Sequence, residues 1–457
     1  MPDNKTTIDL ETGSLMLTHT GFLKKVVRFI SVIIAIFHFY AAGFGAFSAM
    51  NQRSLHWLML TCLAFLYYPA TKKQKKISIF DYLFFGLALA SGLYILLNWQ
   101  TIIITRSGAA SPTDIAFGII AVIVVLEAAR RTIGPVLPIT ALIFLAYTFI
   151  GPYLPMSVGH MGYSLSRLIA ILYMSTEGIF GVAIGVSSSF IIMFVMFGGA
   201  LKALGGGQFF IDLAYSVTGR LRGGPAKTAV ISSALMGSVS GSPIANVVTT
   251  GSFTIPLMKH VGYKPHVAGA IESVASTGGQ IMPPIMGAAA FIMAEFTLRP
   301  YFEIAWAALI PALLYYFAIY LVVDLESVKS GLKGLNKEDL PDLKETIIGG
   351  WFYAIPLGIL IYLLMSGYSP TMSAFYTILL LYLVSCFKHK SLKKSFSLIL
   401  DSFEEGVQNA IPVVAACAAS GIVVGVISLT GLGLRIIGLV EVLSGGSMLI
   451  GLVFMMI

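Results

Sequence analysis

Apolar residues occur in long segments along this chain, and short polar or basic stretches separate them. About ten of these segments are long enough to cross a hydrocarbon core of roughly 30 Å, which requires about 20 helical residues. The pattern predicts an all-α polytopic membrane protein. The predicted spans have approximate cores at Val26–Phe47, Leu55–Pro69, Phe80–Leu97, Asp114–Ala129, Ile133–Ile150, Phe190–Leu204, His266–Glu295, Ile304–Val323, Ile347–Met365 and Thr371–Phe387, and a further span begins near Asn409.

Two polar segments interrupt this pattern in the middle of the chain. The first, Gly237–Asn246, reads GSVSGSPIAN, and the second, Ala275–Pro284, reads ASTGGQIMPP. An unsatisfied amide or carbonyl in hydrocarbon costs several kcal/mol, so irregular backbone at membrane depth is tolerated only where protein buries it or where it lines a polar cavity. Two such breaks in succession predict a site for an ion and a solute.

Basic residues between the apolar segments indicate the orientation of the chain, since positive loops stay in the cytoplasm. Three clusters fall on one side if the N-terminus is cytoplasmic, and residues 1–23 then form a cytoplasmic tail. The alternative, a cleaved signal peptide, lacks a small-x-small cleavage pattern after the first span. The clusters are Lys24, Lys25 and Arg28; Lys72, Lys73, Lys75 and Lys76; and Arg130 with Arg131.

Successive spans cross the membrane in alternate directions, and on this count the segment from about 224 to 258 begins and ends on the cytoplasmic side. Two half-length helices fit there and two full spans do not, so we expect a re-entrant helical hairpin with its turn near Ser238–Asn246. Gly241 and Pro243 lie where that turn is required. The alternative is a slightly kinked single span. The flanking basic residues are Lys202, Arg220, Arg222 and Lys227 before the segment and Lys259, His260, Lys264 and His266 after it.

The next segment, about 266–295, is expected to be a discontinuous helix. Gly278 and Gly279 are followed by Pro283 and Pro284, and proline both removes a backbone donor and blocks the carbonyl one turn earlier. Carbonyl ends of half-helices hold cations and amide ends hold carboxylates, as in transporters built from discontinuous helices. For each small residue taken singly, close helix packing is the alternative.

Composition excludes most other classes. With 57% hydrophobic and 11% charged residues, the 457-residue chain has too few charges to cover a soluble globule. The net charge of +8 comes from short topological clusters, so we do not expect nucleic-acid binding. Cys62, Cys386 and Cys417 stand singly in apolar surroundings, as packing residues do. The sequence contains no Walker loop, no His and Cys metal spacing and no nucleophile elbow, so neither an enzyme nor a cofactor is expected.

A weak internal duplication supports the prediction of a binding site within the membrane. Ile191–Leu213 is similar to Val413–Val440 in its glycine pattern, and the charges place the two copies in opposite orientations. Such an inverted repeat places a site at the membrane midplane. The second repeat would start near 346, after which Ser391–Val407 fits an amphipathic helix on the cytoplasmic surface. A second hairpin should follow Val440, but the chain ends in an apolar run, so we expect a shortened chain or a gene fragment.

At this point several segments closely resemble one family, the fused membrane subunit of the tripartite ATP-independent periplasmic (TRAP) transporters, of the TAXI type. The resemblance covers nearly the whole chain beyond its first hundred residues. It is carried by Gly205–Asp212, Gly219–Lys227, Ala245–Pro256 and Ser276–Phe291, and it extends to Glu127–Gly134, Ser175–Val182, Gly367–Thr371 and Ser428–Gly431.

The resemblance implies a four-helix small-subunit region at 24–131, fused to a large transport subunit at 132–457. It also implies an elevator mechanism in the cell inner membrane, in which a mobile unit carries substrate past a static scaffold. A periplasmic TAXI-type binding protein would deliver a small organic anion. An ion gradient, Na⁺ or alternatively H⁺, would drive import.

The resemblance further assigns the site. The hairpin tip and the broken helix would form one ion site and half of the substrate site, and a Na⁺ would lie at Ser240, Ser242, Thr277 and Gly279. Pro243 departs from the small residue that is usual in the family after the Ser-Gly-Ser turn. The expected binding residues are Ser238, Ser240, Gly241, Ser242, Asn246, Thr249, Thr250, Thr277, Gly278, Gly279 and Gln280, with Ser428 and Thr430 in the second half.

Ionisable residues at membrane depth are costly and often functional. Glu272 could carry a proton if coupling is not to Na⁺; alternatively it lies near the interface, paired with Lys264 or a histidine. Glu127 is expected to pair with Arg130 or Arg131, and Glu177 and Glu295 to lie near the outer surface. Two other classes are considered: a passive channel-like permease, and an intramembrane enzyme, for which no catalytic pair is visible.

Overall fold

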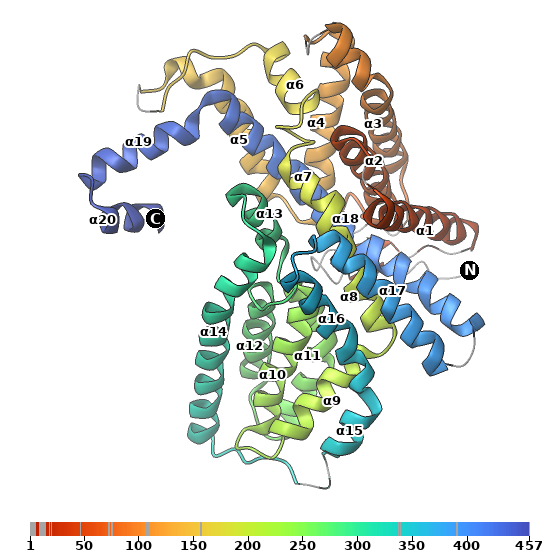
Figure 1. The fold of residues 1–457 in the computed structure, drawn as a ribbon. Coiled ribbons are helices and arrows are strands. Elements are labelled where there is room, and N and C mark those ends of the chain that lie inside the picture. Colours follow the sequence, from red (N-terminus) through yellow and green to blue (C-terminus); the bar gives the residue numbers. More distant parts are fainter. Residues whose placement is uncertain are drawn as a thin grey trace.

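The computed structural model describes residues 6–8, 15–17, 19, 21–45, 47–71, 74, 76–106, 109–155, 158–336, 338, 340–389 and 392–456. Most of these residues are helical (Figure 1), and eight of the described helices are long and apolar enough to cross a membrane. The predicted all-α polytopic membrane fold is therefore confirmed. The eight are Gly21–Phe44, Ile79–Arg106, Pro112–Thr132, Val136–Tyr153, Val182–Ala203, Tyr301–Lys329, Leu343–Met365 and Ser395–Thr430, and shorter apolar helices lie at Ala288–Thr297 and Pro370–Cys386.

Two short strands precede the helices. β1 (Thr6–Ile8) pairs with β2 (Leu15–Leu17) in an antiparallel ladder, with Thr7 opposite Met16. Both strands fall within residues 1–23, for which the sequence predicted a cytoplasmic tail. Most of that tail lies outside the described residues, as do Lys72, Lys73 and Lys75 of the predicted basic cluster.

The region at 24–131 contains four helices: α1 (Gly21–Phe44), α2 (Ala49–Tyr67), α3 (Ile79–Arg106) and α4 (Pro112–Thr132). α2 is largely buried and packs against α3, α4, α7 and α18. Its polar residues find partners there. The buried His56 lies 2.7 Å from His38 of α1 through ring nitrogens and 3.0 Å from the Ser187 hydroxyl. These contacts join the four-helix region to the helices that follow it.

A buried arginine joins α3 to α4. The Arg131 side chain is 1% exposed and pairs with Asp81, and it also bonds Glu127 at 2.7 Å. Its guanidinium lies 5.0 Å from the ring centroid of Phe65 and 5.5 Å from that of Phe84, which adds cation–π attraction. The expected pairing of Glu127 with the arginines is confirmed.

Most of the long helices fall into two groups in Figure 1. α9–α12 lie together with α14 and α15, whereas α4–α7 lie with α1–α3 and much of α18; α8 leads from one group to the other. Their bounds are α5 (Val136–Ile150), η1 (Gly151–Tyr153), α6 (Leu165–Tyr173), α7 (Val182–Val186), η2 (Ser187–Ile191, a π-helix), α8 (Ile192–Ala203), α9 (Gly206–Thr218), α10 (Gly224–Ser240), α11 (Pro243–His260), α12 (Pro265–Thr277), η3 (Gly278–Gln280), α13 (Ala288–Thr297), α14 (Tyr301–Lys329), α15 (Leu343–Gly350), η5 (Trp351–Tyr353), α16 (Ala354–Met365), α17 (Pro370–His389), α18 (Leu392–Thr430), α19 (Leu432–Ser444) and α20 (Met448–Met456).

One expected boundary is wrong. The sequence suggested an amphipathic helix at Ser391–Val407 and a separate span from about Asn409, but α18 is one helix of 39 residues across both. The helix continues through Gly406, which lies against the backbone and side chain of Met196 on α8, where a Cβ would come within 2.9 Å.

α8 and α18 run antiparallel along each other. Lys202 contacts Glu405 and Gly199 contacts Gly406, while Gly178, before α7, contacts Gly421 further along α18. Each of these two helices ends just before a glycine with positive φ that starts the next helix, Gly205 at +96° and Gly431 at +67°. The two segments that the sequence analysis compared therefore share the same break.

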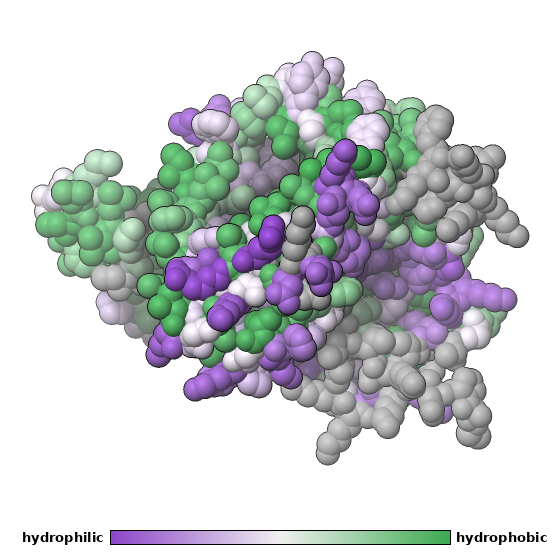
Figure 2. All heavy atoms as spheres, turned by 90° about the horizontal axis from the view of Figure 1, so that it is seen from below, coloured by the Kyte–Doolittle hydropathy of each residue, from purple (hydrophilic) through white to green (hydrophobic). Residues whose placement is uncertain are grey.

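One end of the molecule is markedly polar. Figure 2 shows hydrophilic side chains gathered on the face seen from below, next to hydrophobic surface. The connections α9–α10, α11–α12 and α14–α15 lie at this end in Figure 1. They carry exposed basic residues that the sequence analysis assigned to the cytoplasm, among them Arg220, Arg222, Lys259 and Lys264.

We expect Arg131→Gln to lower the free energy of unfolding by roughly 3–5 kcal/mol, because it leaves Asp81 buried without a cation. Thermal unfolding in detergent measures the change. Asp81→Asn added to Arg131→Gln should recover part of the loss. Arg130→Gln is the control, since its side chain is 45% exposed and such pairs contribute about 0–1 kcal/mol. Equal losses in the two single variants would contradict the assigned role of Arg131.

Candidate functional site

α10 and α11 form a tight helical hairpin. α10 ends at Ser240, Gly241 has a φ of +64°, and Ser242 caps α11 by accepting a hydrogen bond from the Ala245 amide. Pro243 occupies the first position of α11, where its fixed φ and missing N–H suit a helix start. The turn therefore lies inside the predicted region Ser238–Asn246, and Pro243 begins the second helix.

The helix after the hairpin is discontinuous, as predicted. α12 ends at Thr277, the short helix η3 follows, and residues 281–287 are irregular before α13 begins. The hairpin supplies a partner for this irregular backbone, because the Ile285 amide donates to the Ser238 carbonyl at 3.1 Å. Within the irregular segment, the Gly287 amide donates to the Gln280 carbonyl at 2.8 Å. The first bond therefore joins the two breaks.

Glycines allow the two breaks to approach closely. A Cβ built on Gly237 would lie 2.5 Å from the Gly279 Cα and 3.1 Å from the Asn246 side-chain nitrogen. A Cβ on Gly241 would lie 2.0 Å from the Met286 carbonyl oxygen. Any side chain at these positions would push the hairpin away from the broken helix.

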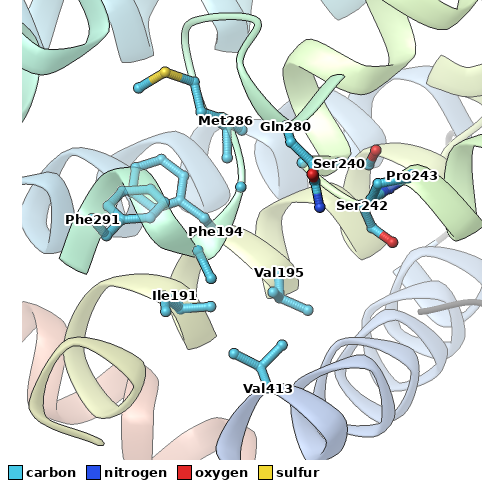
Figure 3. A pocket seen from close by; sticks show the side chains of 14 residues that line it. Ile191, Phe194, Val195, Ser240, Ser242, Pro243, Gln280, Met286, Phe291 and Val413 are labelled. Carbon is cyan, nitrogen blue, oxygen red and sulfur yellow. The ribbon is translucent and has the colours of Figure 1, made fainter. Parts of the chain in front are cut away.

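A cavity of about 180 Å³ lies at this junction. Figure 3 shows Ser240, Ser242 and Gln280 on one side of it and the rings of Phe194 and Phe291 on the other. The lining comes from four parts of the chain: the α8 region, the hairpin tip, the irregular segment with α13, and α18. It consists of Ile191, Phe194, Val195, Ser240, Gly241, Ser242, Pro243, Gln280, Ile285, Met286, Gly287, Ala288, Phe291 and Val413.

A second, smaller cavity of about 30 Å³ shares Ser240 and Val195 with the first. Its lining includes an ion pair between Lys202 of α8 and Glu405 of α18. The two cavities therefore meet at the last residue of α10. The small cavity is lined by Val195, Gly198, Gly199, Lys202, Met236, Ser240, Ala245, Thr249, Glu405 and Asn409.

Two buried oxygen atoms near this junction have no partner among the described residues. They are the Ser240 hydroxyl and the Asn246 side-chain carbonyl. The Asn246 amide nitrogen is held by the Ser233 carbonyl at 2.8 Å, which fixes the orientation of the side chain. Unpaired buried oxygens are costly, and neutral oxygen ligands suit a small hard cation or an ordered water. Of the four residues expected at the Na⁺, Ser240 therefore offers an unpaired oxygen, and Asn246, which was expected among the other binding residues, offers a second.

Glu272 lies in a different environment from the one expected. Its side chain is fully buried and has no basic partner among the described residues, so the pairing with Lys264 or a histidine is wrong. Hydroxyls surround the carboxyl group instead. Ser233 and Ser276 lie 3.0 and 3.2 Å from Oε1, Thr250 also bonds Oε1, and Thr254 bonds Oε2. We call these five residues the Glu272 cluster.

The other predicted residues are distributed unevenly. Thr249 lines the small cavity, whereas Thr250 belongs to the Glu272 cluster. Thr277 is exposed and its hydroxyl donates to the Ser273 carbonyl, and Gly278 packs on the rings of Tyr315 and Tyr316. Neither residue lines the two cavities.

Ser428 and Thr430 lie at the end of α18, also outside the linings of the two cavities. The Ser428 hydroxyl lies 3.4 Å from Glu177, and Thr430 donates to the Val426 carbonyl at 2.8 Å. The described structure therefore does not bring this pair to the hairpin.

Sequence reasoning missed several lining residues. Phe194, Phe291 and Val413 read as ordinary membrane-helix residues, and only the packing of three distant segments brings them together. Lys202 was interpreted as a topological signal. A signal did exist for part of the Glu272 cluster, since Ser276 follows Glu272 by four residues, as Thr254 follows Thr250, and helical residues four apart share a face.

We expect Gly241→Ala to destabilise the protein by roughly 1–3 kcal/mol, since alanine disfavours this left-handed backbone and its Cβ would collide with the Met286 carbonyl. Gly269→Ala on α12 is the matched control, because no atom lies within 4 Å of a Cβ there. Thermal unfolding of both variants in detergent compares them. A Gly241→Ala protein as stable as the control would show that the hairpin does not require glycine here.

Several known proteins are similar to this chain in sequence. Parts of the chain are 28% identical to the C4-dicarboxylate TRAP transporter large permease protein DctM of Pseudomonas aeruginosa, over 42% of this chain and 48% of that protein. They are 25% identical to the isethionate TRAP transporter permease protein DctMQ of Oleidesulfovibrio alaskensis, over 56% and 41%. A putative TRAP transporter large permease protein of Haemophilus influenzae is 31% identical over 20% and 21%.

The chain spans between about a fifth and about a half of the length of the curated relatives it matches. The match to a family model is more extensive. The model of the tripartite ATP-independent periplasmic transporter, DctM component, matches residues 120–457, which include both helix breaks and both cavities. The chain therefore belongs to the DctM family of TRAP transporter permeases.

Proposed function

We propose that the chain acts as the permease of a binding-protein-dependent secondary transporter that imports small organic anions across the inner membrane. Membership of the DctM family supports this proposal, as do the substrates in the relatives' names, C4-dicarboxylates and isethionate. A periplasmic binding protein of the TAXI type would deliver the substrate. The exposed basic residues at the polar end of the molecule, among them Arg220, Arg222 and Lys259, support a cytoplasmic position for that end.

The junction of the hairpin with the broken helix is the observation that carries the proposal. It combines a cavity of a size suited to a small solute with two unpaired buried oxygens. In our proposal Na⁺ binds at Ser240 and Asn246 near the Gly237–Gly279 contact, and the substrate occupies the larger cavity. Ser242 and Gln280 would orient the substrate from the polar side.

An elevator motion would carry this site across the membrane. The hairpin, the broken helix and α14 form one group in Figure 1, and the amino-terminal helices with α18 form the other. Both cavities lie where these groups meet, because their linings include residues of α8 and α18 as well as of the hairpin. Movement of one group against the other would open the cavities in turn.

Uptake in proteoliposomes tests the proposal. With a cognate binding protein outside, we expect an inward Na⁺ gradient to drive accumulation of labelled succinate or isethionate. Ser240→Ala with Asn246→Ala should reduce Na⁺-driven uptake by on the order of tenfold or more, since two buried ligands are lost. Ser252→Ala, on the exposed side of α11, is the control.

Two results would contradict this assignment. Uptake that proceeds equally without any gradient or binding protein would indicate a passive channel-like permease. Unchanged Na⁺ dependence in the double variant would remove the ion site from the hairpin.

Proton coupling through Glu272 is the second candidate, and the Glu272 cluster favours it specifically. An isolated carboxylate buried without a cation is costly, whereas a neutral carboxyl group is not. Thr250 and Thr254 also lie 2.8 and 3.0 Å from the carbonyls of Asn246 and Thr250, so each single hydroxyl hydrogen has two possible acceptors. The cluster can therefore hold Glu272 in either protonation state by redirecting hydroxyl hydrogens.

Under this candidate, Glu272→Gln abolishes uptake driven by a proton gradient but preserves substrate exchange between the two sides at equal pH. Glutamine is neutral and close in shape to the protonated acid, so the thermal stability should change little. Uptake and counterflow by the same vesicles compare the two modes. Proton-driven uptake at the wild-type rate in Glu272→Gln would rule out Glu272 as the carrier.

A further inference from the structure

The small cavity has a charged wall that the assigned ion and solute sites do not use. Of the described residues that line the two cavities, Lys202 is the one base and Glu405 is the one acid. Their charged atoms lie 2.7 Å apart, and the side chains are 32% and 29% exposed. Partly exposed pairs of this kind contribute little to stability. The pair can therefore exchange partners at little cost.

Neutral hydrogen-bonding groups face the same space. The Asn409 side chain lines the small cavity and has no hydrogen-bond partner among the described residues. The Ser240 hydroxyl, which borders both cavities, is buried and unpaired. The Lys202 ammonium has three N–H donors, of which Glu405 uses one. The small cavity thus presents a cation and additional donors with no internal acceptor assigned to them.

The dimensions suit one carboxylate group. A cavity of about 30 Å³ corresponds to roughly two water-sized probe positions, and a carboxylate places two oxygens in a comparable space. The adjoining cavity is larger, at about 180 Å³, and much of its wall is apolar, including Phe194, Phe291 and Val413. The two cavities together therefore match an amphipathic molecule with an anionic end and a short carbon skeleton.

We propose that the small cavity is the carboxylate subsite of the substrate, with Lys202 as the cation and with Asn409 and Ser240 as donors. In the described structure Glu405 holds the position on Lys202 that the substrate carboxylate would take. Substrate binding replaces one carboxylate by another on the same ammonium, and Glu405 returns when the substrate leaves. The proposal rests on the proposed import of organic anions and adds the residue that recognises their charge.

Binding can be measured without transport. We expect succinate, and more weakly acetate, to raise the unfolding temperature of the purified wild-type protein in detergent, because a ligand that binds only the folded state stabilises it. Succinamide at the same concentration should have no effect. Lys202→Gln should weaken the apparent affinity for succinate by on the order of tenfold or more, whereas Glu405→Gln should strengthen it, since the competing internal carboxylate is gone.

Two further variants show whether a lost effect of succinate comes from the subsite or from misfolding. Lys202→Gln with Glu405→Gln removes both charges and leaves no unpaired ion, and it should still lose the succinate effect. Lys259→Gln, at an exposed position on α11, should retain it. Wild-type protein that neither carboxylate stabilises, or equal stabilisation of the wild-type and Lys202→Gln proteins, would overturn the subsite.

Uptake separates this inference from the proposed function. Lys202→Arg should restore succinate uptake in vesicles, with a raised KM and a largely preserved maximal rate. If succinate stabilises the wild-type protein through Lys202 but no gradient drives uptake, the subsite stands and the transport proposal fails. If uptake occurs with the same KM in the wild-type and Lys202→Gln proteins, transport stands and the subsite fails.

Discussion

Backbone polar groups inside a membrane must find partners within the protein, and the central part of this fold depends on that constraint. The hairpin turn and the broken helix each leave amides and carbonyls free, and they satisfy one another through contacts such as Ile285 to Ser238. Small residues make this possible, because Gly237 meets Gly279 and Gly241 meets the Met286 carbonyl with no side chain between them. The groups left over, above all at Ser240 and Asn246, are the ones available to an ion or a solute.

Ionisable side chains within the helical fold have three different kinds of surroundings. Arg131 is neutralised by Asp81 and Glu127 and is covered by aromatic rings, which suits a fixed structural element. Among the described residues, hydroxyl groups supply the hydrogen bonds to the Glu272 carboxyl group, and such groups can serve it in either protonation state. Lys202 and Glu405 form a partly exposed pair at a cavity, where either partner can be replaced. The contacts of Arg131 hold its charge in place, whereas the surroundings of Glu272 suit either protonation state and those of Lys202 suit an exchange of partners.

The position of the cavities links the two halves of the described chain. α8 and α18 run antiparallel, and glycines on each allow a close approach near Gly199 and Gly406. The hairpin packs against α8 and faces α18 across the cavities, so the solute-sized cavity has one wall from the hairpin group and another from α8 and α18. A displacement of the hairpin relative to α18 would change the shape of both cavities at once.

The sequence by itself determined the membrane class, the helical hairpin and the discontinuous helix. These follow from local chemistry, since the length of an apolar segment and the positions of glycine and proline limit what each segment can form. Tertiary structure alone decided that α18 is continuous through Gly406, that hydroxyls rather than Lys264 surround Glu272, and that Thr277 points away from the cavities. The packing of α8 and α18 likewise placed Lys202 and Val413 on the walls of the cavities. The physical reason is that side-chain partners come from distant segments, and their choice depends on how whole helices pack, which local sequence patterns do not encode.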